Sequence, residues 1–545
     1  MKKLSAFIIC ILLCLPSCGS SDSHQGDGSG MMYNAALLGN PQSLDPQYAD
    51  DEASNTVISN LYSGLLKRDS SGNISCCNAE SYSVSDDGRT YRFKLRTDNY
   101  WFFDKNENDK VDENEFFPVT ADDYVFALRR ILNPEMQSPF AEEFSCIMGG
   151  RSAIDGTASS ENIGVSAEDD YTLVITLDYP SADFLNLLAS NAAFPCNEDF
   201  FISTKGRYGL DDKSVMSNGA FFVRQWFYDP YGNNNILYMK KNSANSSDEN
   251  KIYPSYLSFT IEKNETDIRE LFKNDTIDCF TTMNIGSFNK KKYSIAASRS
   301  VTLGLIFNPQ DKICSNQNFR KSLAYGIDRS SLNDEISSDV QTASGIIPPS
   351  VTLLGRSYRE LSSDSAFDFY DEAKALSFCE AAKSDLNVES FGTLKLITAT
   401  NSVDSGYLHS VTRKLQDTLG FYIGVEEVTQ SEFDSRIKSG DYQIALYPVK
   451  GGYNSGISVL EQFSVSEVIG ISENTSGEIG SLRKVADFTE LSEKLLLTEK
   501  HILEEFSFIP IFYKNSYLIT DNANEDIAYD AFSGAVDFRI AKNFD

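Results

Sequence analysis

The second half of the chain alternates between amphipathic helices and short apolar strands, and this alternation restricts the fold more than any other feature. Apolar residues recur at helical spacing in the first kind of segment, whereas β-branched and aromatic residues are frequent in the second. The helices are predicted over residues 318–332, 370–386 and 406–420, and the strands over 393–400, 422–428 and 442–449. Because alternating helices and strands build layered α/β structures, we expect an α/β fold.

The first half of the chain combines strands, a hairpin and helices. Residues 31–39 predict a strand, and residues 50–66 predict a helix whose acidic first residues suit the helix dipole. Residues 79–103 predict a β-hairpin, and residues 119–132 predict a capped amphipathic helix. At 545 residues the chain is too long for a single core, so we expect two or three domains.

The net charge argues against one class of partner. The chain has 48 basic and 78 acidic residues, which gives a formal charge of −30. A surface of this kind repels phosphate backbones, so we expect no nucleic-acid partner. It suits a protein that works outside the cytoplasm or that meets cations.

The N-terminus has the pattern of a targeting segment. A short basic start precedes an apolar stretch that is too short to span a membrane as a stable helix. The stretch ends in "LPSCGSS", which resembles a bacterial lipobox. We therefore expect residues 1–17 to be a lipoprotein signal peptide, Cys18 to be lipidated, and residues 18–30 to be a flexible tether. The alternative is an ordinary signal peptide with an incidental cysteine.

Cysteine and histidine usage excludes several kinds of site. Seven cysteines follow Cys18, and they form no CxxC pair, so neither a disulfide framework nor a zinc site is indicated. Only His409 and His501 lie beyond the tether, and no nucleophile-elbow, zinc-protease or phosphate-loop motif occurs in a suitable context. We expect no catalytic residue, although carboxylate pairs for glycoside hydrolysis stay open because acids are abundant.

The stretch "DKNENDKVDENE" has the spacing of an EF-hand calcium loop. Oxygen-bearing side chains stand at positions one, three, five, nine and twelve, and the main-chain carbonyl at position seven would add another ligand. These candidate metal ligands are Asp104, Asn106, Asn108, Lys110 (carbonyl), Asp112 and Glu115. The sixth position is aspartate rather than glycine, although aspartate tolerates a positive φ better than most residues. A structural calcium ion is therefore one interpretation, and a solvated acidic hairpin loop is the other.

Several stretches together resemble one protein family. In the first half these are "SLDPQYADDEASNTVISNLYSGLLKRDSSG", "AESYSVSDDGRTYRFKLR" and "VTADDYVFALRRILNPEMQSPFA". Later landmarks follow in order: "SNGAFFVRQW", "FNPQDKICSNQNFRKSLAYGIDR", "IIPPS", "YDEAKALSFCEAA" and "FSFIPIFY". Over nearly the whole chain after the leader, this series resembles the extracellular solute-binding proteins of oligopeptide and dipeptide ABC importers, of the family 5 type.

The resemblance implies a two-lobed periplasmic-binding-protein-like fold of the class II type, with an extra domain and a ligand cleft between the lobes. Closure of the lobes would sequester the ligand from water, and a transporter would recognise the closed form. Carried over to this sequence, lobe I would comprise 31–67, 194–300 and 509–545, the extra domain 68–193, and lobe II 301–508.

The function that the resemblance implies is capture of oligopeptides, or similar extended solutes, and their delivery to the membrane permease of an ABC importer. The protein would be a lipid-anchored monomer on the extracytoplasmic side of the cell envelope, would not be an enzyme, and would require no cofactor. Three alternatives stay open: a receptor for a non-peptide ligand such as an oligosaccharide, a sensory receptor, and a surface hydrolase that uses carboxylates.

In this family the peptide lies extended and pairs with main-chain groups of the cleft. The segment 48–53 matches one cleft segment, which makes Asp50 and Asp51 candidate ligand-binding residues, although they could instead cap the following helix. "SPFAEEFSCIMGG" matches another cleft-facing segment, with Glu143 and Phe144 as candidates.

A third cleft segment is "YPVKGGYNSG". In peptide-binding members of the family, an aspartate just before the equivalent of "YN" holds the α-amino group of the peptide. Gly452 stands at that position here, with Tyr453 and Asn454 after it and Lys450 nearby, and these four residues are candidates. Because the anchoring charge is absent, either another acid such as Asp50 or Asp51 replaces it, or the ligand is a blocked peptide or another solute.

Overall fold

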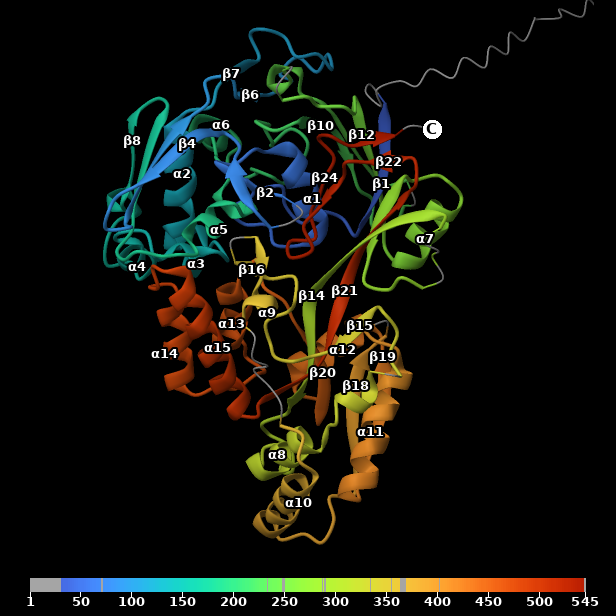
Figure 1. Cartoon of the computed structure of the whole chain (residues 1–545). Coiled ribbons are helices and arrows are strands. Elements are labelled where there is room, and N and C mark those ends of the chain that lie inside the picture. The colour runs from blue at the N-terminus through green and yellow to red at the C-terminus, as the bar shows by residue number, and fades with distance from the viewer. Residues whose placement is uncertain are drawn as a thin grey trace, which may run out of the picture.

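The structure, a computed structural model, describes residues 31–543 except 70–71, 233, 248–249, 287, 289–290, 334, 354, 363–368 and 401. The predicted signal peptide, the tether and Cys18 lie outside the described residues. Figure 1 shows an upper body and a lower body joined by two long strands. The predicted α/β fold is confirmed, while the exact domain boundaries stay predictions.

One mixed sheet runs through both bodies. Its strand order is β10-β11-β12-β1-β13-β21-β14-β20-β18-β19, and β15 also pairs with β21. β14 (Tyr293–Phe307) and β21 (Phe508–Asp521) are antiparallel partners. β21 pairs with β13 at its lobe I end, and β14 pairs with β20 at its lobe II end. The two strands therefore belong to both lobes and connect them (Figure 1).

Lobe I holds the N-terminal part of this sheet, where β1 is parallel to both β12 and β13. The strands are β1 (Met32–Leu38), β10 (Phe221–Phe227), β11 (Ile236–Lys241), β12 (Tyr256–Glu262) and β13 (Cys279–Thr282). The helices are α1 (Glu52–Leu61), α6 (Glu198–Ser203), α7 (Glu265–Lys273) and the short η4 (Ser243–Asn245). Short pairs complete the lobe: β2 (Leu66–Arg68) with β3 (Ile74–Cys76), β22 (Asn524–Glu525) with β25 (Lys542–Asn543), and β23 (Ala528–Tyr529) with β24 (Val536–Asp537).

The extra domain has its own four-stranded sheet, in the order β4-β5-β9-β8, against which α2 packs. The predicted hairpin is confirmed, since Tyr82 pairs with Phe93 across it. The strands are β4 (Ala79–Val84), β5 (Thr90–Leu95), β6 (Tyr100–Phe102), β7 (Phe116–Pro118), β8 (Val165–Asp169) and β9 (Thr172–Thr176). The helices are α2 (Ala121–Leu132), α3 (Ala141–Phe144), α4 (Gly150–Ile154), α5 (Phe184–Leu188), η1 (Pro134–Met136), η2 (Ser160–Asn162) and η3 (Asn191–Ala193).

Lobe II contains the α/β alternation, and all three of its predicted strands and three predicted helices are confirmed. These are β18 (Thr393–Ala399), β19 (Tyr422–Val428), β20 (Ile444–Val449), α8 (Gln317–Gly326), α10 (Glu372–Leu386) and α11 (Ser405–Leu419). The other elements are α9 (Tyr358–Leu361), α12 (Gln430–Ser439), α13 (Gly456–Val465), α14 (Glu473–Leu482), α15 (Phe488–Glu504), η5 (Ser330–Leu332), β15 (Val340–Thr342), β16 (Thr352–Leu353) and β17 (Arg356–Ser357). In Figure 1, α14 and α15 lie directly below α3 and α5 of the extra domain.

Two large hydrophobic cores stabilise the molecule. One core consists of residues from 301 to 532 and fills lobe II. The other joins Leu37 and Phe259 of lobe I to Phe93 and Leu128 of the extra domain in a single cluster. Lobe I and the extra domain therefore share one core, so we expect them to move together when the lobes open or close.

Gly304 tests the packing of the connecting strands. A Cβ at this position of β14 would overlap the ring of Phe508 on β21, which is fully buried and packs edge-on against Phe463 at 5.3 Å between ring centroids. We expect Gly304→Ala to lower the free energy of unfolding by about 1–3 kcal/mol, as overpacked cores do, when measured by urea denaturation.

Gly477→Ala is the matched control, since Gly477 is an exposed residue of α14 with nothing within 4 Å of its added Cβ. This change should leave stability unchanged or raise it by up to about 1 kcal/mol, through helix propensity. Equal effects of the two substitutions would contradict the proposed tight packing at Gly304.

Candidate ligand-binding cleft

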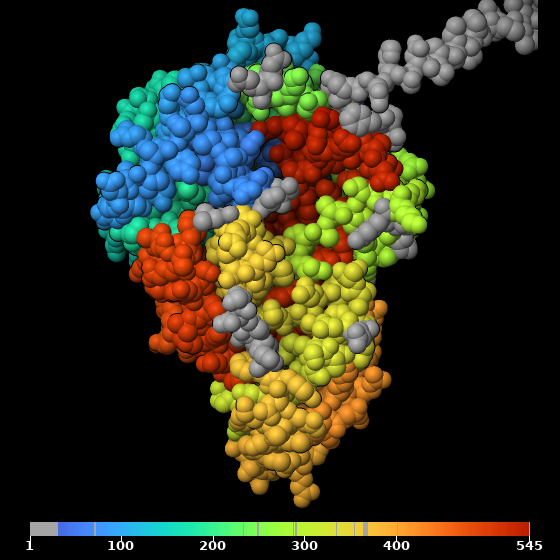
Figure 2. Space-filling model, viewed as in Figure 1, coloured from blue at the N-terminus to red at the C-terminus, as the bar shows by residue number. Residues whose placement is uncertain are grey.

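A cavity of about 380 Å³ lies where the two lobes meet the connecting strands. Ligand pockets commonly have volumes of this size. Its walls include Arg68 and Asp69 at the end of β2, Ser298 from β14, and Ser350 and Asn454 from lobe II. On the face shown in Figure 2, the blue N-terminal surface, the yellow segment around residue 350 and the red C-terminal segment meet. The cavity is therefore built from parts of the chain that are far apart in sequence.

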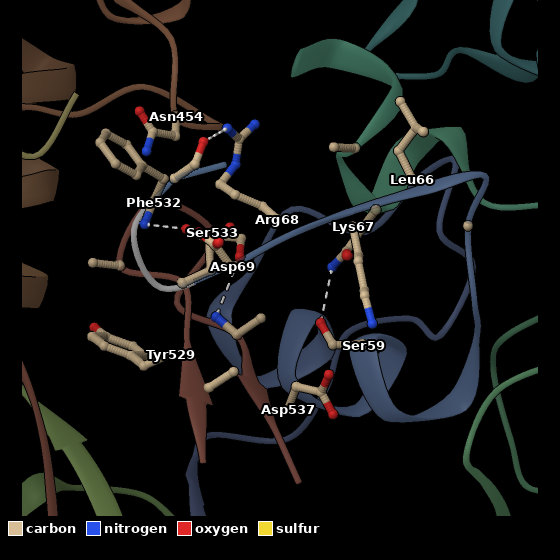
Figure 3. A pocket seen from close by; sticks show the side chains of 18 of the residues that line it. Ser59, Leu66, Lys67, Arg68, Asp69, Asn454, Tyr529, Phe532, Ser533 and Asp537 are labelled. Atoms are coloured by element: carbon tan, nitrogen blue, oxygen red, sulfur yellow. Dashed lines mark hydrogen bonds between the residues drawn. The ribbon is translucent and has the colours of Figure 1, made fainter. Parts of the chain in front are cut away.

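Charged side chains of both signs line this cavity. The basic ones are Lys67, Arg68 and Arg539, and the acidic ones are Asp69, Asp530 and Asp537. Burial lowers the pKa of Arg68, whose Nη1 donates to Asn186 Oδ1 at 3.1 Å. Figure 3 shows Arg68 and Asn454 toward one end of the cavity, and Tyr529 and Asp537 toward the other. Such a lining suits a ligand with charges or dipoles of both signs.

One edge of β14 is unpaired beside the cavity. Over residues 293–299, β14 pairs only with β21 among the described strands, and its pairing with β20 begins at Thr302. Ala297 and Ser298 of this segment line the cavity. An unpaired strand edge presents main-chain N–H and C=O groups that an extended chain can pair with.

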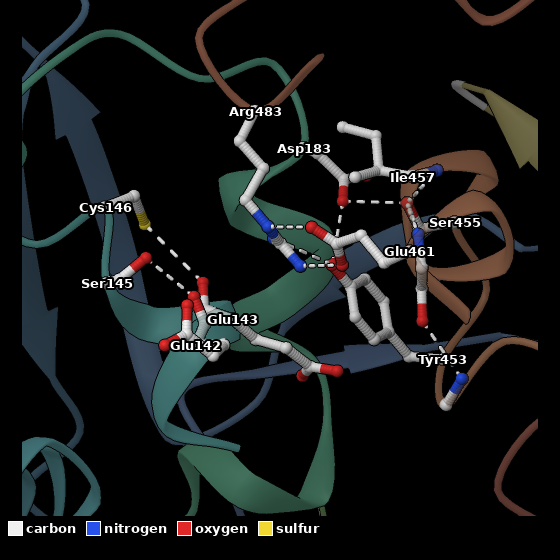
Figure 4. A network of polar contacts seen from close by, with 12 residues as sticks. Glu142, Glu143, Ser145, Cys146, Asp183, Tyr453, Ser455, Ile457, Glu461 and Arg483 are labelled. Atoms are coloured by element: carbon white, nitrogen blue, oxygen red, sulfur yellow. Dashed lines mark hydrogen bonds and ion pairs between the residues drawn. The ribbon is translucent and has the colours of Figure 1, made fainter. Parts of the chain in front are cut away.

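A buried polar network joins the extra domain to lobe II (Figure 4). Asp183, just before α5, accepts hydrogen bonds from Tyr453 Oη at 2.9 Å and Ser455 Oγ at 2.8 Å. Arg483, just after α14, pairs with Glu461 of α13 and donates to Tyr453 Oη at 3.2 Å. Burial raises the pKa of both carboxyl groups, Asp183 and Glu461. Because buried polar groups are costly without partners, this network stabilises the contact between the two lobes.

Glu143 faces this network without joining it. The residue lies on α3 and is half-buried, and its carboxylate takes part in none of the hydrogen bonds or ion pairs found among the described residues. Burial raises its pKa to about 7, while Arg483 nearby lowers it. A Cβ built on Gly452 would lie 3.9 Å from Glu143 Oε1. With Asp183 and Glu461, three carboxylates share one guanidinium, so this site has an excess of negative charge.

The acids at the start of α1 have a different position from the one expected. Asp51 is the N-cap of α1: its Oδ1 accepts from Ser54 N at 2.9 Å, and its Oδ2 accepts from Ser54 Oγ at 2.5 Å. Asp50 is exposed, and neither acid lines the cavity described above. For Asp51 the structure supports the capping interpretation.

Lys450 forms an ion pair with Glu52 at 2.9 Å between Nζ and Oε1, which links lobe II to α1.

Two predicted ligand-binding residues have buried side chains. Phe144 is fully buried in the core shared by lobe I and the extra domain. Tyr453 is 4% exposed, lies in the same core, and has its hydroxyl bound by Asp183 and Arg483. Neither side chain has a free surface for a ligand in this structure, so these residues could contact a ligand only through main-chain groups, and their role stays a prediction.

The remaining two residues of this segment differ in their surroundings. Asn454 lines the cavity, where its Oδ1 accepts from Thr352 N at 2.9 Å. Gly452 is exposed beside Glu143. The structure thus brings Glu143 and Gly452 together.

Sequence reasoning missed most of the cavity lining. Pro349 and Ser350 belong to the landmark "IIPPS", which could have identified them, since its position in the chain follows the family order. Arg68 belongs to the first landmark, "SLDP…LLKRDSSG", whereas the residues of the C-terminal segment from Ala528 to Arg539 carry no comparable motif. Their contribution depends on the chain returning to lobe I through β21, which only the fold shows.

The predicted calcium loop lies in the extra domain between β6 and β7, and none of its residues lines the cavity. Across the described part of the chain, no three His, Cys, Asp or Glu side chains are already grouped to hold a metal ion. The seven described cysteines are free thiols. None of the described helices has both the length and the apolarity needed to cross a membrane.

Comparison with known proteins places the chain in a family. The family model described as "Bacterial extracellular solute-binding proteins, family 5 Middle" matches residues 76–470. Oligopeptide-binding protein OppA of Bacillus subtilis (strain 168) is 25% identical over 553 residues, which cover 96% of each chain.

Solved structures share the fold. The structure of Listeria monocytogenes OppA bound to peptide aligns with a TM-score of 0.72 and 22% identity, covering 94% of this chain and 99% of that one. A periplasmic oligopeptide-binding protein (OppAIV) of Borrelia burgdorferi gives a TM-score of 0.75 at 20% identity, covering 94% and 100%.

The two lobes, the connecting strands and the cavity between them define a solute-binding protein of the two-lobed class. With the match of the family model, the chain belongs to the bacterial extracellular solute-binding proteins of family 5. The resemblance inferred from the sequence motifs is thereby confirmed.

Proposed function

We propose that this protein captures peptides in the cleft between its lobes and delivers them to the permease of an ABC importer. Two relatives support a peptide as the ligand. OppA of Bacillus subtilis is named as an oligopeptide-binding protein, and Listeria OppA was solved with peptide bound. Capture by lobe closure requires neither turnover of the ligand nor a cofactor, and we expect the protein to act as a monomer.

The unpaired edge of β14 is the observation that favours a peptide over other solutes. The Arg299 carbonyl accepts from Ser350 N at 3.1 Å, but over residues 293–298 this edge forms no ladder with a described strand other than β21, and Ala297 and Ser298 line the cavity, where an extended peptide can pair with it. Pairing through main-chain groups reads no particular side chain, so it permits peptides of many sequences. An oligosaccharide would make no regular use of such an edge.

Peptide binding is tested by thermal shift and calorimetry with three ligand sets of equal concentration. We expect a pool of short peptides to raise Tm, because a ligand that binds only the folded state stabilises it. The same peptides with N-methylated main chains should raise Tm much less, since they cannot donate to the strand edge. A rise in Tm with oligosaccharides and none with any peptide would contradict the peptide proposal and favour a non-peptide ligand.

Glu143 is the group that we assign to the cationic end of the ligand. Its carboxylate has no hydrogen-bond or ion-pair partner among the described residues, it stands opposite Gly452, and its surroundings contain two further acids and one arginine. A peptide ammonium would supply the missing positive charge and the hydrogen-bond donors. Glu143, in the extra domain, would then bind the α-amino group of the peptide, which Gly452, in lobe II, cannot bind because it has no side chain.

Glu143→Gln should weaken binding of a free-amine peptide by about 10- to 100-fold, as the loss of a charged hydrogen bond does. Binding of the N-acetylated peptide should change little. In the wild type, affinity should rise with pH as Glu143 ionises through its pKa of about 7, and should fall again as the peptide amine deprotonates near pH 8.

Calorimetry across pH 5.5–9 measures this profile, because the range extends at least about one pH unit beyond the pKa of each group. If Glu143 causes the rise in affinity through pH 7, the rise should vanish in Glu143→Gln. A rise that persists in this variant would assign it to Asp183 or Glu461. Glu142→Gln is the matched control, because Glu142 is exposed and paired with Arg151 at 2.5 Å. Equal losses for both variants would refute the role of Glu143.

A lipid anchor at Cys18 is the part of the proposal that concerns location. The family is extracellular, and "LPSCGSS" resembles a lipobox. In cells fed a traceable fatty acid, we expect the wild type to be labelled and to sediment with membranes. Cys18→Ser should lose both properties, whereas Cys14→Ser, within the leader, should keep them. Labelling that persists in Cys18→Ser would exclude this anchor.

A further inference from the structure

The acidic loop Asp104–Glu115 is not explained by the proposed function. It closes the short hairpin of β6 and β7, in which Trp101 pairs with Phe117. An uncompensated acidic loop repels itself, so its ordered path requires a physical cause. That cause is found in its hydrogen bonds and in the distribution of its charges.

The side chains at the predicted ligand positions turn inward and organise the loop. Asp104 accepts from the main-chain N–H of Asn108 at 3.1 Å and of Asp109 at 2.9 Å. The amide groups of Asn106 and Asn108 both reach Asp112 Oδ2, at 3.1 and 2.8 Å. Asp109, at the sixth position, has φ 61°, which is the left-handed conformation that glycine usually supplies there. The first, third, fifth and ninth positions thus surround a common centre.

Some acidic side chains of the loop form ion pairs with basic residues, and those at the predicted ligand positions do not. Glu107, at position four, pairs with Lys213 at 2.7 Å, and Asp109, at position six, pairs with Arg224 at 2.7 Å. Among the described residues, no ion pair is formed by Asp104, Asp112 or Glu115, the three acids at ligand positions one, nine and twelve. Basic side chains therefore neutralise two of the acids that a cation would not contact, whereas the acids at the ligand positions form no ion pair with a described residue.

Glu115 provides a second, independent observation. Its side chain is only 8% exposed, and its Oε1 accepts from Asn106 N at 3.0 Å, which places the carboxylate against the loop. Its other oxygen, Oε2, is buried, and no described residue donates a hydrogen bond to it. A buried carboxylate oxygen without a partner is costly, and a cation at the loop centre would satisfy it.

We propose that this loop is a calcium site. The ligands would be side-chain oxygens of Asp104, Asn106, Asn108, Asp112 and Glu115, together with the carbonyl oxygen of Lys110. Asparagine and carbonyl oxygens make up half of this set, and the three carboxylates would have to move closer to one another to bind the ion. This accounts for the absence of a cluster of three acidic side chains among the described residues. Calcium accepts six to eight oxygens in a flexible shell, whereas magnesium demands a smaller, near-octahedral one. The ion would neutralise the unpaired acids and fix the hairpin of the extra domain.

The test is calorimetric titration of the full chain, stripped of metal by a chelator, with calcium up to about 10 mM, a limit that covers weak extracellular sites. We expect one calcium per chain, a rise of Tm with calcium, and little response to equal magnesium. Glu115→Gln should weaken binding at least 10-fold. Glu113→Gln, which removes the same charge from exposed position ten of the loop, should change affinity less than about twofold.

A second variant tests the site if the first one fails to fold. If Glu115→Gln unfolds the hairpin, as near-ultraviolet circular dichroism of Trp101 would show, Asp104→Asn takes its place with the same expected loss. A wild type that binds no calcium over this range, or equal losses for Glu115→Gln and Glu113→Gln, would overturn the site. Peptide binding is measured separately, so failure here leaves the proposed function untouched.

Discussion

The antiparallel pairing of β14 and β21 is the constraint on which the rest of the structure depends. The two strands pair along their whole length, yet their outer neighbours differ at the two ends: β13 in lobe I and β20 in lobe II. Their register shifts between Arg299 and Val301, at the passage from one lobe to the other. A bulge bends a ladder without breaking it, so it allows the lobes to rotate while the sheet stays continuous. The same change of neighbours leaves the edge of β14 free beside the cavity, so the hinge strand is also a wall of the binding site.

Closure and ligand charge are coupled through the contact between lobe II and the extra domain. Tyr453 inserts into the core of the opposite lobe, and Asp183 accepts hydrogen bonds from it and from Ser455. Opening would return these groups to water, while closure keeps three carboxylates near one guanidinium. A cationic ligand at Glu143 would reduce that imbalance only when the lobes are closed. Because a ligand shifts an equilibrium by its difference in affinity for the two states, this arrangement favours closure around a cation.

The fold was largely predictable from sequence, and the site was not, for physical reasons. Helix and strand periodicity reports which residues face a core, so α8, α10, α11 and the hairpin of β4 and β5 were predicted correctly. Main-chain groups of a strand edge leave no side-chain pattern, which is why residues 293–299 were missed. Glu143 and Phe144 are neighbours on the single turn of α3, where one faces the network and the other the core. A resemblance between segments identifies such a turn but does not tell which of its sides faces the ligand.

In a chain with 78 acidic residues, nearness between carboxylates is weak evidence of a site. Most of these acids are solvated or paired with lysine and arginine, as Glu107 and Asp109 are. A carboxylate oxygen that is withdrawn from water and lacks a donor is much more informative, because folding must offset its desolvation by other contacts. Glu143, at the contact between the extra domain and lobe II, and Glu115, in the loop, share this property in part, and their surroundings differ. Glu143 stands beside the exposed Gly452 at the contact between the extra domain and lobe II, whereas Glu115 is buried against a loop of the extra domain alone. The first environment suits an exchangeable ammonium, and the second suits a resident ion that stabilises the hairpin.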